Sequence, residues 1–229
     1  MSTEPAAPPT RRRPAPWVVV VMLFIAVGTL AASILLNPPR TKPPVVEPPP
    51  ADPVAVPPFA LTERSGKPVN NADLLGKVWV GSFVFSRCTG PCPSVSATMA
   101  KLQADYADKP DFRLVTFTFD PTTDTPAELK KYADHFRADA DRWLFLTGSE
   151  DELHRLARDT FKLAVNRNAD PAADPGKKFE HTTYVTVVDK KGHVRGHFSG
   201  FRGEHDTTGE HFADSQARLR HTIDTALAE

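Results

Sequence analysis

The sequence has very little cysteine and no net charge, and each of these deficits excludes a class of protein. Its 229 residues include only 2 cysteines, too few for a domain that disulfide bonds hold together. The 28 basic and 28 acidic side chains balance, whereas a nucleic-acid-binding surface needs a positive excess to face the phosphates. Hydrophobic residues make up 40% of the chain, so the chain can fold around a core and is not wholly disordered.

Proline is scarce only in the larger part of the chain. Fifteen of the 23 prolines lie before Phe59, which leaves 8 for the remaining 171 residues. Charge is uneven in the same way, because residues 1–42 carry five basic side chains against one acidic side chain. The rest carries 23 basic and 27 acidic side chains, a net charge of −4. The composition therefore predicts four parts, which are residues 1–16, 17–36, 37–58 and 59–229.

Residues 17–36 form a run of twenty without a charged side chain. A helix of that length spans roughly 30 Å, the hydrocarbon thickness of a bilayer. The alternative is a cleaved signal peptide, whose apolar region is usually only about 7–15 residues long. The run therefore predicts one transmembrane helix. Three arginines precede it and two basic residues follow it, which predicts a cytoplasmic N-terminal tail and a periplasmic or otherwise extracytoplasmic body. Residues 37–58, rich in proline, are predicted to be an extended linker.

Residues 59–229 alternate between strand and helix patterns. Apolar runs of strand length predict buried strands, and amphipathic stretches predict helices, two of which begin with a Thr or Ser followed three residues later by Glu. The predicted strands are 59–62, 77–85, 112–119, 143–146, 183–188 and 193–198, the last two joined by a turn at 189–192, and the predicted helices are 94–106, 125–137, 149–161 and 212–227. This order predicts an α/β fold of thioredoxin type.

Cys88 and Cys92 lie in the stretch SRCTGPCP, between a predicted central strand and the next helix. Open α/β folds place their sites at this edge of the sheet. Cys92 falls at the predicted helix start, where unbonded N–H groups favour a thiolate. A purely structural disulfide is the alternative, but a bridge across so short a loop would constrain the unfolded chain little. The two cysteines are therefore predicted to form a functional site, for disulfide exchange or for metal binding.

The spacing of the two cysteines favours a metal. Two intervening residues would indicate a general disulfide oxidoreductase, whereas three leave room for an ion between the sulfurs. Two thiolates and one imidazole suit Cu(I), or Cu(II) with a further ligand, while zinc normally takes four ligands. His181 is the candidate third ligand, in a predicted loop before the strand 183–188. Other histidines are predicted to lie at exposed positions, on a strand (His193 and His197) or on helices (His135, His154 and His221).

The sequence resembles the Sco/SenC family of membrane-anchored copper proteins over essentially all of residues 59–229. Four segments carry the resemblance: VGSFVFSRCTGPCPSVSATMAKLQ, FTFDPTTDTPAELKKYA, WLFLTG and HTTYVTVVDKKGHVRGHF. The resemblance implies that Cys88, Cys92 and His181 bind copper. It also marks Asp120, Asp124 and Pro126 as a structural edge beside the site, without a ligand role.

The chain departs from that family at two residues between the cysteines. Many members have Pro-Asp or a similar pair after the first cysteine, where this chain has Thr89-Gly90, which removes a nearby negative charge.

The implied function is a copper metallochaperone that helps to load the copper-A site of a cytochrome c oxidase subunit in the same membrane. The alternatives are a thiol-disulfide oxidoreductase that uses Cys88 and Cys92 as its redox pair, a redox or copper sensor, and a peroxiredoxin-like peroxidase.

Overall fold

The computed structural model describes residues 17, 22, 54–170, 174–181, 183–203 and 206–229, with the backbone alone at 180 and 181. The chain divides into two compact units, Met1–Val45 and Val46–Glu229. The predicted tail, most of the predicted transmembrane run and most of the predicted linker lie outside the described residues. Within the described ranges, no helix has the length and apolar character needed to cross a membrane. The description that follows concerns the second unit.

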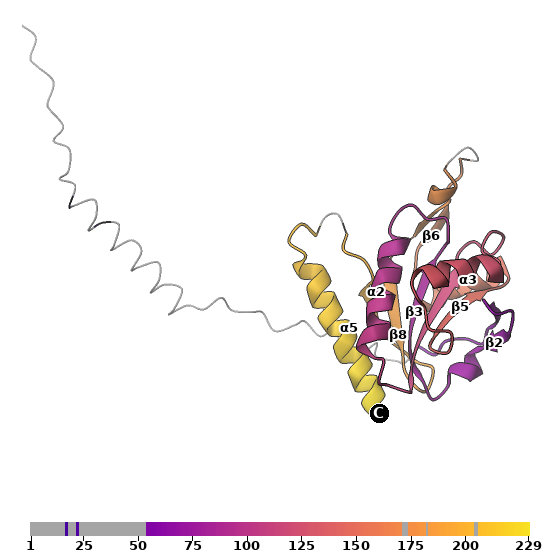
Figure 1. Cartoon of the computed structure of the whole chain (residues 1–229), viewed down its shortest axis with the longest axis horizontal. Coiled ribbons are helices and arrows are strands. Elements are labelled where there is room, and N and C mark those ends of the chain that lie inside the picture. The colour runs from indigo at the N-terminus through magenta and orange to yellow at the C-terminus, as the bar shows by residue number, and fades with distance from the viewer. Residues whose placement is uncertain (1–16, 18–21, 23–53, 171–173, 182, 204–205) are drawn as a thin grey trace, which may run out of the picture. The chain divides into compact units, whose positions relative to one another are not determined.

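A seven-stranded sheet forms the centre of this unit (Figure 1). Its three middle strands run parallel, and every other neighbouring pair is antiparallel. Across the sheet the order is β2 (Pro68–Asn70), β1 (Ala60–Glu63), β5 (Trp143–Thr147), β4 (Phe112–Thr118), β3 (Val78–Val84), β8 (Tyr184–Val188) and β9 (Val194–Ser199). All seven residues of β3 are buried, as expected for a strand that has a neighbour on each side and is covered on both faces.

Two hydrophobic cores cover the two faces of the sheet, because successive strand residues point to opposite faces. Val78 and Val80 pack in one core with α2 (Cys92–Asp105), α3 (Pro126–His135) and α5 (Glu210–Ala228). Trp79 and Phe83 pack in the other with α4 (Glu150–Arg155) and the π-helical η2 (Leu156–Thr160). The alternation along one strand therefore sorts the helices into layers, and the predicted α/β fold class is confirmed.

The helix-start patterns read from the sequence are present. Thr125 is the N-cap of α3 and its hydroxyl accepts a hydrogen bond from the Glu128 N–H, while Ser149 caps α4 through the Glu152 N–H in the same way. The predicted turn between β8 and β9 is also present, with Gly192 at φ +80°. A residue with a Cβ would be strained at that φ.

The folded unit begins earlier than the predicted boundary at Phe59. The N–H of Val194 donates to the carbonyl of Val54 (2.8 Å), and the N–H of Val56 donates to the carbonyl of Gly192 (2.9 Å). Val56 is 7% exposed and belongs to a hydrophobic core. The last residues of the predicted linker therefore pack against the start of β9, where strand-like hydrogen bonds fix them.

The segment between η2 and β8 contains structure that the sequence pattern did not predict. β6 (Val165–Arg167) and β7 (Phe179–His181) pair antiparallel, and a short 3-10 turn, η3 (Pro175–Lys177), precedes β7. His181 was predicted to lie in a loop, and this is wrong, because its backbone pairs with Val165 at the end of β7. Strands of three residues with mixed polar side chains give too little periodicity to be recognised.

Candidate metal centre

The cysteine loop, defined as Phe85–Pro91, joins the end of β3 to the start of α2. β3 and β4 are parallel, so their carboxyl ends lie side by side at one edge of the sheet, the upper edge in Figure 1. The Cys88 N–H donates to the carbonyl of Phe85 (3.1 Å) and turns the chain back. Cys92 is the first residue of α2. A central strand and the helix that follows it therefore bring both predicted cysteines to one place, as expected from the sequence.

The two sulfurs differ in burial. Cys92 is completely buried, whereas Cys88 is half-buried. Burial raises the pKa of the Cys92 thiol well above its ordinary value, and the hydrogen bond and charge of Cys88 raise it further. A hydrogen bond from the backbone at Phe85 opposes this rise without cancelling it. The prediction that the helix start favours a Cys92 thiolate is therefore wrong, because burial raises the pKa of this thiol.

Asp124 fixes the first residues of the cysteine loop. Its carboxylate accepts the Ser86 N–H (3.1 Å to Oδ2) and the Ser86 hydroxyl. It also accepts the hydroxyl of Thr118 from the last residue of β4. Asp124 is fully buried, and burial raises its pKa although these hydrogen bonds oppose the rise. The structural role predicted for Asp124 therefore takes a specific form, which is a buried acceptor that joins the ends of β3 and β4.

Asp120 connects the same edge to the segment before β7. Its Oδ1 lies 2.6 Å from Nζ of Lys178 and also accepts the hydroxyl of Thr122 (2.7 Å). Burial alone would raise the pKa of Asp120, but the hydrogen bonds from Lys178 and the threonines hold it below its ordinary value. The two aspartates of one motif therefore occupy opposite electrostatic environments.

Tyr132 approaches the site from α3, and no sequence motif pointed to it. Its hydroxyl lies 2.9 Å from the hydroxyl of Ser96, one helical turn after Cys92. Burial raises the pKa of Tyr132, and the charge of Cys92 and Cys88 adds to this effect. The contact joins two helices that are remote in sequence, so only their packing could reveal it.

β7 ends in His181 at this same edge. Two residues earlier, Phe179 packs edge-on against Phe85 of the cysteine loop, with 5.5 Å between ring centroids. Just after His181, Thr183 lies beside the start of β8, which is antiparallel to β3 and so begins where β3 ends. The side chain of His181 is outside the described part of the molecule. Among the described side chains, no group of three or more His, Cys, Asp and Glu could hold a metal ion.

Three other histidine predictions need correction. His193, predicted to be exposed, is half-buried, and its Nδ1 lies 3.8 Å from the carboxylate of Asp189, directly after β8. His197 is half-buried, its Nδ1 lies 2.9 Å from the Thr186 hydroxyl, and burial lowers its pKa. His154, predicted to lie on the surface, is also half-buried, with Nε2 2.9 Å from the carbonyl of Phe119. His135 and His221 are exposed, as predicted. Each half-buried ring contacts a neighbouring strand or its end, which a helical or strand pattern by itself does not show.

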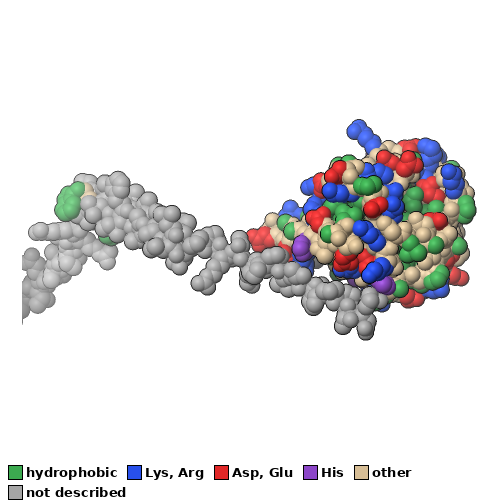
Figure 2. All heavy atoms as spheres, turned by 90° about the horizontal axis from the view of Figure 1, so that it is seen from below, with side chains coloured by type: hydrophobic (Ala, Val, Ile, Leu, Met, Phe, Trp, Pro, Cys, Tyr) green, Lys and Arg blue, Asp and Glu red, His purple; other side chains and the backbone are tan. Residues whose placement is uncertain are grey.

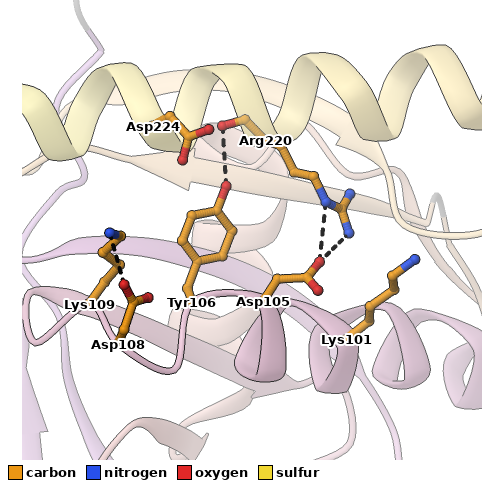
Figure 3. Close-up of a pocket in the computed structure, with 7 residues that line it drawn as sticks. All are labelled: Lys101, Asp105, Tyr106, Asp108, Lys109, Arg220 and Asp224. Atoms are coloured by element: carbon orange, nitrogen blue, oxygen red, sulfur yellow. Dashed lines mark hydrogen bonds and ion pairs between the residues drawn. The ribbon is translucent and has the colours of Figure 1, made fainter.

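A hollow of about 610 Å³ lies at the other end of α2, away from the cysteine loop (Figure 3). The Tyr106 hydroxyl donates to the carbonyl of Arg220 (3.3 Å), and the Arg220 guanidinium lies 2.7 Å from Asp105. The hollow contains no cysteine or histidine. Arg220 pairs with Asp105 across α2 and α5, and Lys109 pairs with its neighbour Asp108, so four of the charged groups around the hollow are already in ion pairs.

Comparison with known proteins decides the family. Residues 48–214 match the model of the SCO1/SenC family, and this range contains the cysteine loop, both aspartates and β7. The chain belongs to the SCO1/SenC family. The SCO1 protein homolog of Bacillus subtilis is 38% identical over 114 residues, which are 49% of this chain and 59% of that protein. The match thus spans less than two thirds of the relative.

Solved structures of Sco proteins share this fold. The structure of BsSco, described as a member of the Sco family of cytochrome c oxidase assembly proteins and containing a disulfide switch, is 29% identical with a TM-score of 0.58. The match covers 74% of this chain and 96% of the BsSco chain. ScoI of Bradyrhizobium japonicum, solved with copper bound, is 25% identical with a TM-score of 0.53, over 72% of this chain and 100% of that one. The thioredoxin-like Sco fold thus accommodates copper in a relative.

Proposed function

We propose that this Sco protein is a copper metallochaperone whose cargo binds at Cys88, Cys92 and His181. The observation that supports the proposal most is that the cysteine loop and the first residue of α2 bring two sulfurs together at the carboxyl edge of the sheet, with one half-buried and one buried. Thiolate and imidazole donors in low number suit Cu(I). The backbone of His181 ends β7 at that edge, and the copper-bound Bradyrhizobium relative has the same fold.

The unequal burial of the sulfurs suits a cargo that must leave again. The half-buried Cys88 is accessible to an incoming thiolate of an acceptor, while the buried Cys92 keeps its bond until the acceptor has supplied a second donor. Binding the ion requires the loss of the Cys92 proton, whose pKa burial and Cys88 raise, so a cation at the loop would offset that cost. Transfer then proceeds by ligand exchange, without a covalent intermediate.

The acceptor belongs to the same proposal. The relative BsSco is described as a cytochrome c oxidase assembly protein, and we infer that the acceptor here is the oxidase subunit that carries the copper-A site. The apolar run 17–36 and the proline-rich residues 37–58 would anchor the domain and let it reach the surface of the same membrane. In this arrangement the domain lies outside the cytoplasm.

A copper titration tests the ligand set. The full chain, reduced and held in detergent, is titrated with Cu(I) against a competing chelator, and the His181→Ala variant is compared with it. Removal of a ligand should lower the affinity at least as much as loss of a group outside the ligand shell, about 10–100-fold. The His221→Ala variant is the control, because His221 is exposed on α5. If His181→Ala and the unaltered chain bind copper equally, the proposed ligand set is wrong.

A second candidate function, thiol-disulfide exchange, is favoured by the contact between the two cysteines and by the disulfide switch of BsSco. A thiolate of the pair would attack an acceptor disulfide, form a mixed disulfide and release one acceptor thiol. The other cysteine would then displace the second acceptor thiol, so that the acceptor gains two electrons and Cys88–Cys92 becomes a disulfide. A redox or copper sensor would use the same two states.

The two functions separate in one assay. Reduced chain is mixed with an oxidised peptide that contains two cysteines, and acceptor thiols are counted for the unaltered chain, Cys92→Ser and His181→Ala. Exchange without a role for copper predicts that His181→Ala reduces the peptide normally while Cys92→Ser stops at the mixed disulfide. If the unaltered chain binds copper but does not reduce the peptide, thiol-disulfide exchange is excluded and only the metallochaperone function remains.

A further inference from the structure

The turn before β7 approaches the cysteine loop so closely that it requires a glycine. Gly176 of η3 is buried, and its carbonyl accepts the Thr89 N–H at 3.3 Å. A Cβ at this position would lie 2.6 Å from Cγ2 of Thr89 and 2.9 Å from the backbone carbonyl oxygen of Arg87. These separations are below van der Waals contact, so any larger residue would move η3 away from the cysteine loop.

An ion pair makes a second contact between the same two segments. Lys178 is two residues after Gly176, and its Nζ lies 2.6 Å from Oδ1 of Asp120, whose side chain is 3% exposed. The pair joins the turn after β4 to the residue directly before β7. Removing the amine would leave a buried carboxylate without its opposite charge, which is more costly than breaking an exposed pair.

Phe179 makes a third contact, through its ring. It is 5% exposed and packs against Phe85 and, at 5.8 Å between centroids, against His154 of α4. The Lys178 ammonium lies 5.5 Å from the centre of the Phe179 ring. Gly176, Lys178 and Phe179 therefore fix this short segment to the cysteine loop, to the turn after β4 and to α4.

We propose that Gly176 and Lys178 are positioning residues for the copper site, because they hold β7, and so the backbone of His181, at a set place relative to Cys88 and Cys92. This inference rests on the proposed function. It assigns no ligand role to either residue, since each acts through β7. It also gives Thr89, where the chain departs from many family members, a structural partner in Gly176.

The test compares copper affinity in two backgrounds. In the full chain, Lys178→Met should weaken Cu(I) binding about tenfold, the lower end of what groups outside the ligand shell contribute. In the His181→Ala background the same substitution should change the affinity by less than about twofold, because the residue through which it acts is gone. Lys178→Arg keeps the charge and should restore most of the affinity.

Two further variants separate positioning from general damage. Gly176→Ala displaces the same segment while leaving every charge in place, and its expected effect is again a loss of affinity that depends on His181. Lys77→Met is the matched control, because Lys77 forms a 2.7 Å ion pair with Asp111 at the opposite end of the strands. The thiolate-to-copper absorption of the Cu(II) form should shift for Lys178→Met and stay unchanged for Lys77→Met.

The outcomes are distinct. Equal losses for Lys178→Met in both backgrounds, or no loss in the unaltered background, would overturn the positioning role while the ligand set stands. If His181→Ala itself leaves copper affinity unchanged, the ligand set of the proposed function is wrong and the inference falls with it. The inference is supported if Lys178→Met lowers copper affinity only in chains that contain His181, and if Lys178→Arg keeps most of the affinity.

Discussion

The two ends of the parallel strands β3 and β4 both carry charged side chains, but they bury these side chains to different extents. At the carboxyl ends, Asp120 and Asp124 are 3% and 0% exposed and are held by hydroxyl, amide and ammonium donors. At the amino ends, Lys77 and Asp111 form an ion pair whose side chains are 32% and 47% exposed. Figure 2, which views the molecule from below, shows acidic and basic side chains interspersed over that end.

The difference indicates where polar groups determine structure. A carboxylate in contact with water loses little when its partner is removed, because solvent replaces the partner. A buried carboxylate has no such replacement, so its donors are fixed in number and direction. The carboxyl edge therefore holds the cysteine loop in one geometry, while the ion pairs at the amino edge, including the Arg220–Asp105 pair at the hollow in Figure 3, remain in contact with solvent.

The largest effect that tests this comparison is expected from Asp124→Ala. The substitution leaves the Ser86 N–H and the Ser86 and Thr118 hydroxyls without their acceptor in a buried place, which should cost about 3 kcal/mol of the free energy of unfolding. Asp111→Ala at the other end should cost at most about 1 kcal/mol. Urea denaturation of both variants measures the difference, and equal costs would break the comparison.

A smaller effect is expected in the reactivity of the two cysteines. In metal-free, reduced protein, the Cys92→Ser variant retains only the half-buried Cys88, and this thiol should react quickly with iodoacetamide. Cys88→Ser leaves the buried Cys92, which burial keeps protonated and covered, and it should react at least about tenfold more slowly. Mass spectrometry of timed samples gives both rates. Similar rates would mean that the carboxyl edge does not exclude the reagent.

The smallest effect concerns acid stability, in which the two aspartates should oppose each other. The lowered pKa of Asp120 means that its ionised form stabilises the fold above its ordinary pKa of 3.8, and this stability is lost as the pH falls through the folded value. Asp124 has a raised pKa, so it favours the fold at low pH and this contribution is lost as the pH rises from 3.8 through its folded value.

Two variants check the signs. Asp120→Asn should flatten the rise of unfolding free energy with pH in the acid range, and Asp124→Asn should make it steeper in the window just above 3.8. Denaturant midpoints measured from acid to neutral pH give both slopes. Changes of the same sign in the two variants would show that the environments of the two carboxylates do not differ as the contacts indicate.

Much of the fold was predictable because local rules and tertiary packing agree. The runs 77–85 and 112–119 are rich in apolar residues, and they form the central strands β3 and β4. Thr125 and Ser149 cap helices by contacts within four residues, so no distant partner is needed. β6 and β7 were missed, since each has three residues and exists through pairing with the other and through Phe179 in the core.

The sequence by itself determined the fold class, the position of the cysteine loop between a buried strand and a helix, and the aspartates that follow β4. Periodicity and short-range capping depend on neighbours along the chain, and these are visible in the sequence. Only the tertiary structure decided that Cys92 is buried with a raised pKa, that Asp120 pairs with Lys178 across 58 residues, and that Gly176 lies against Thr89. Burial and long-range contacts depend on which surfaces meet when the chain folds, and no local pattern specifies that.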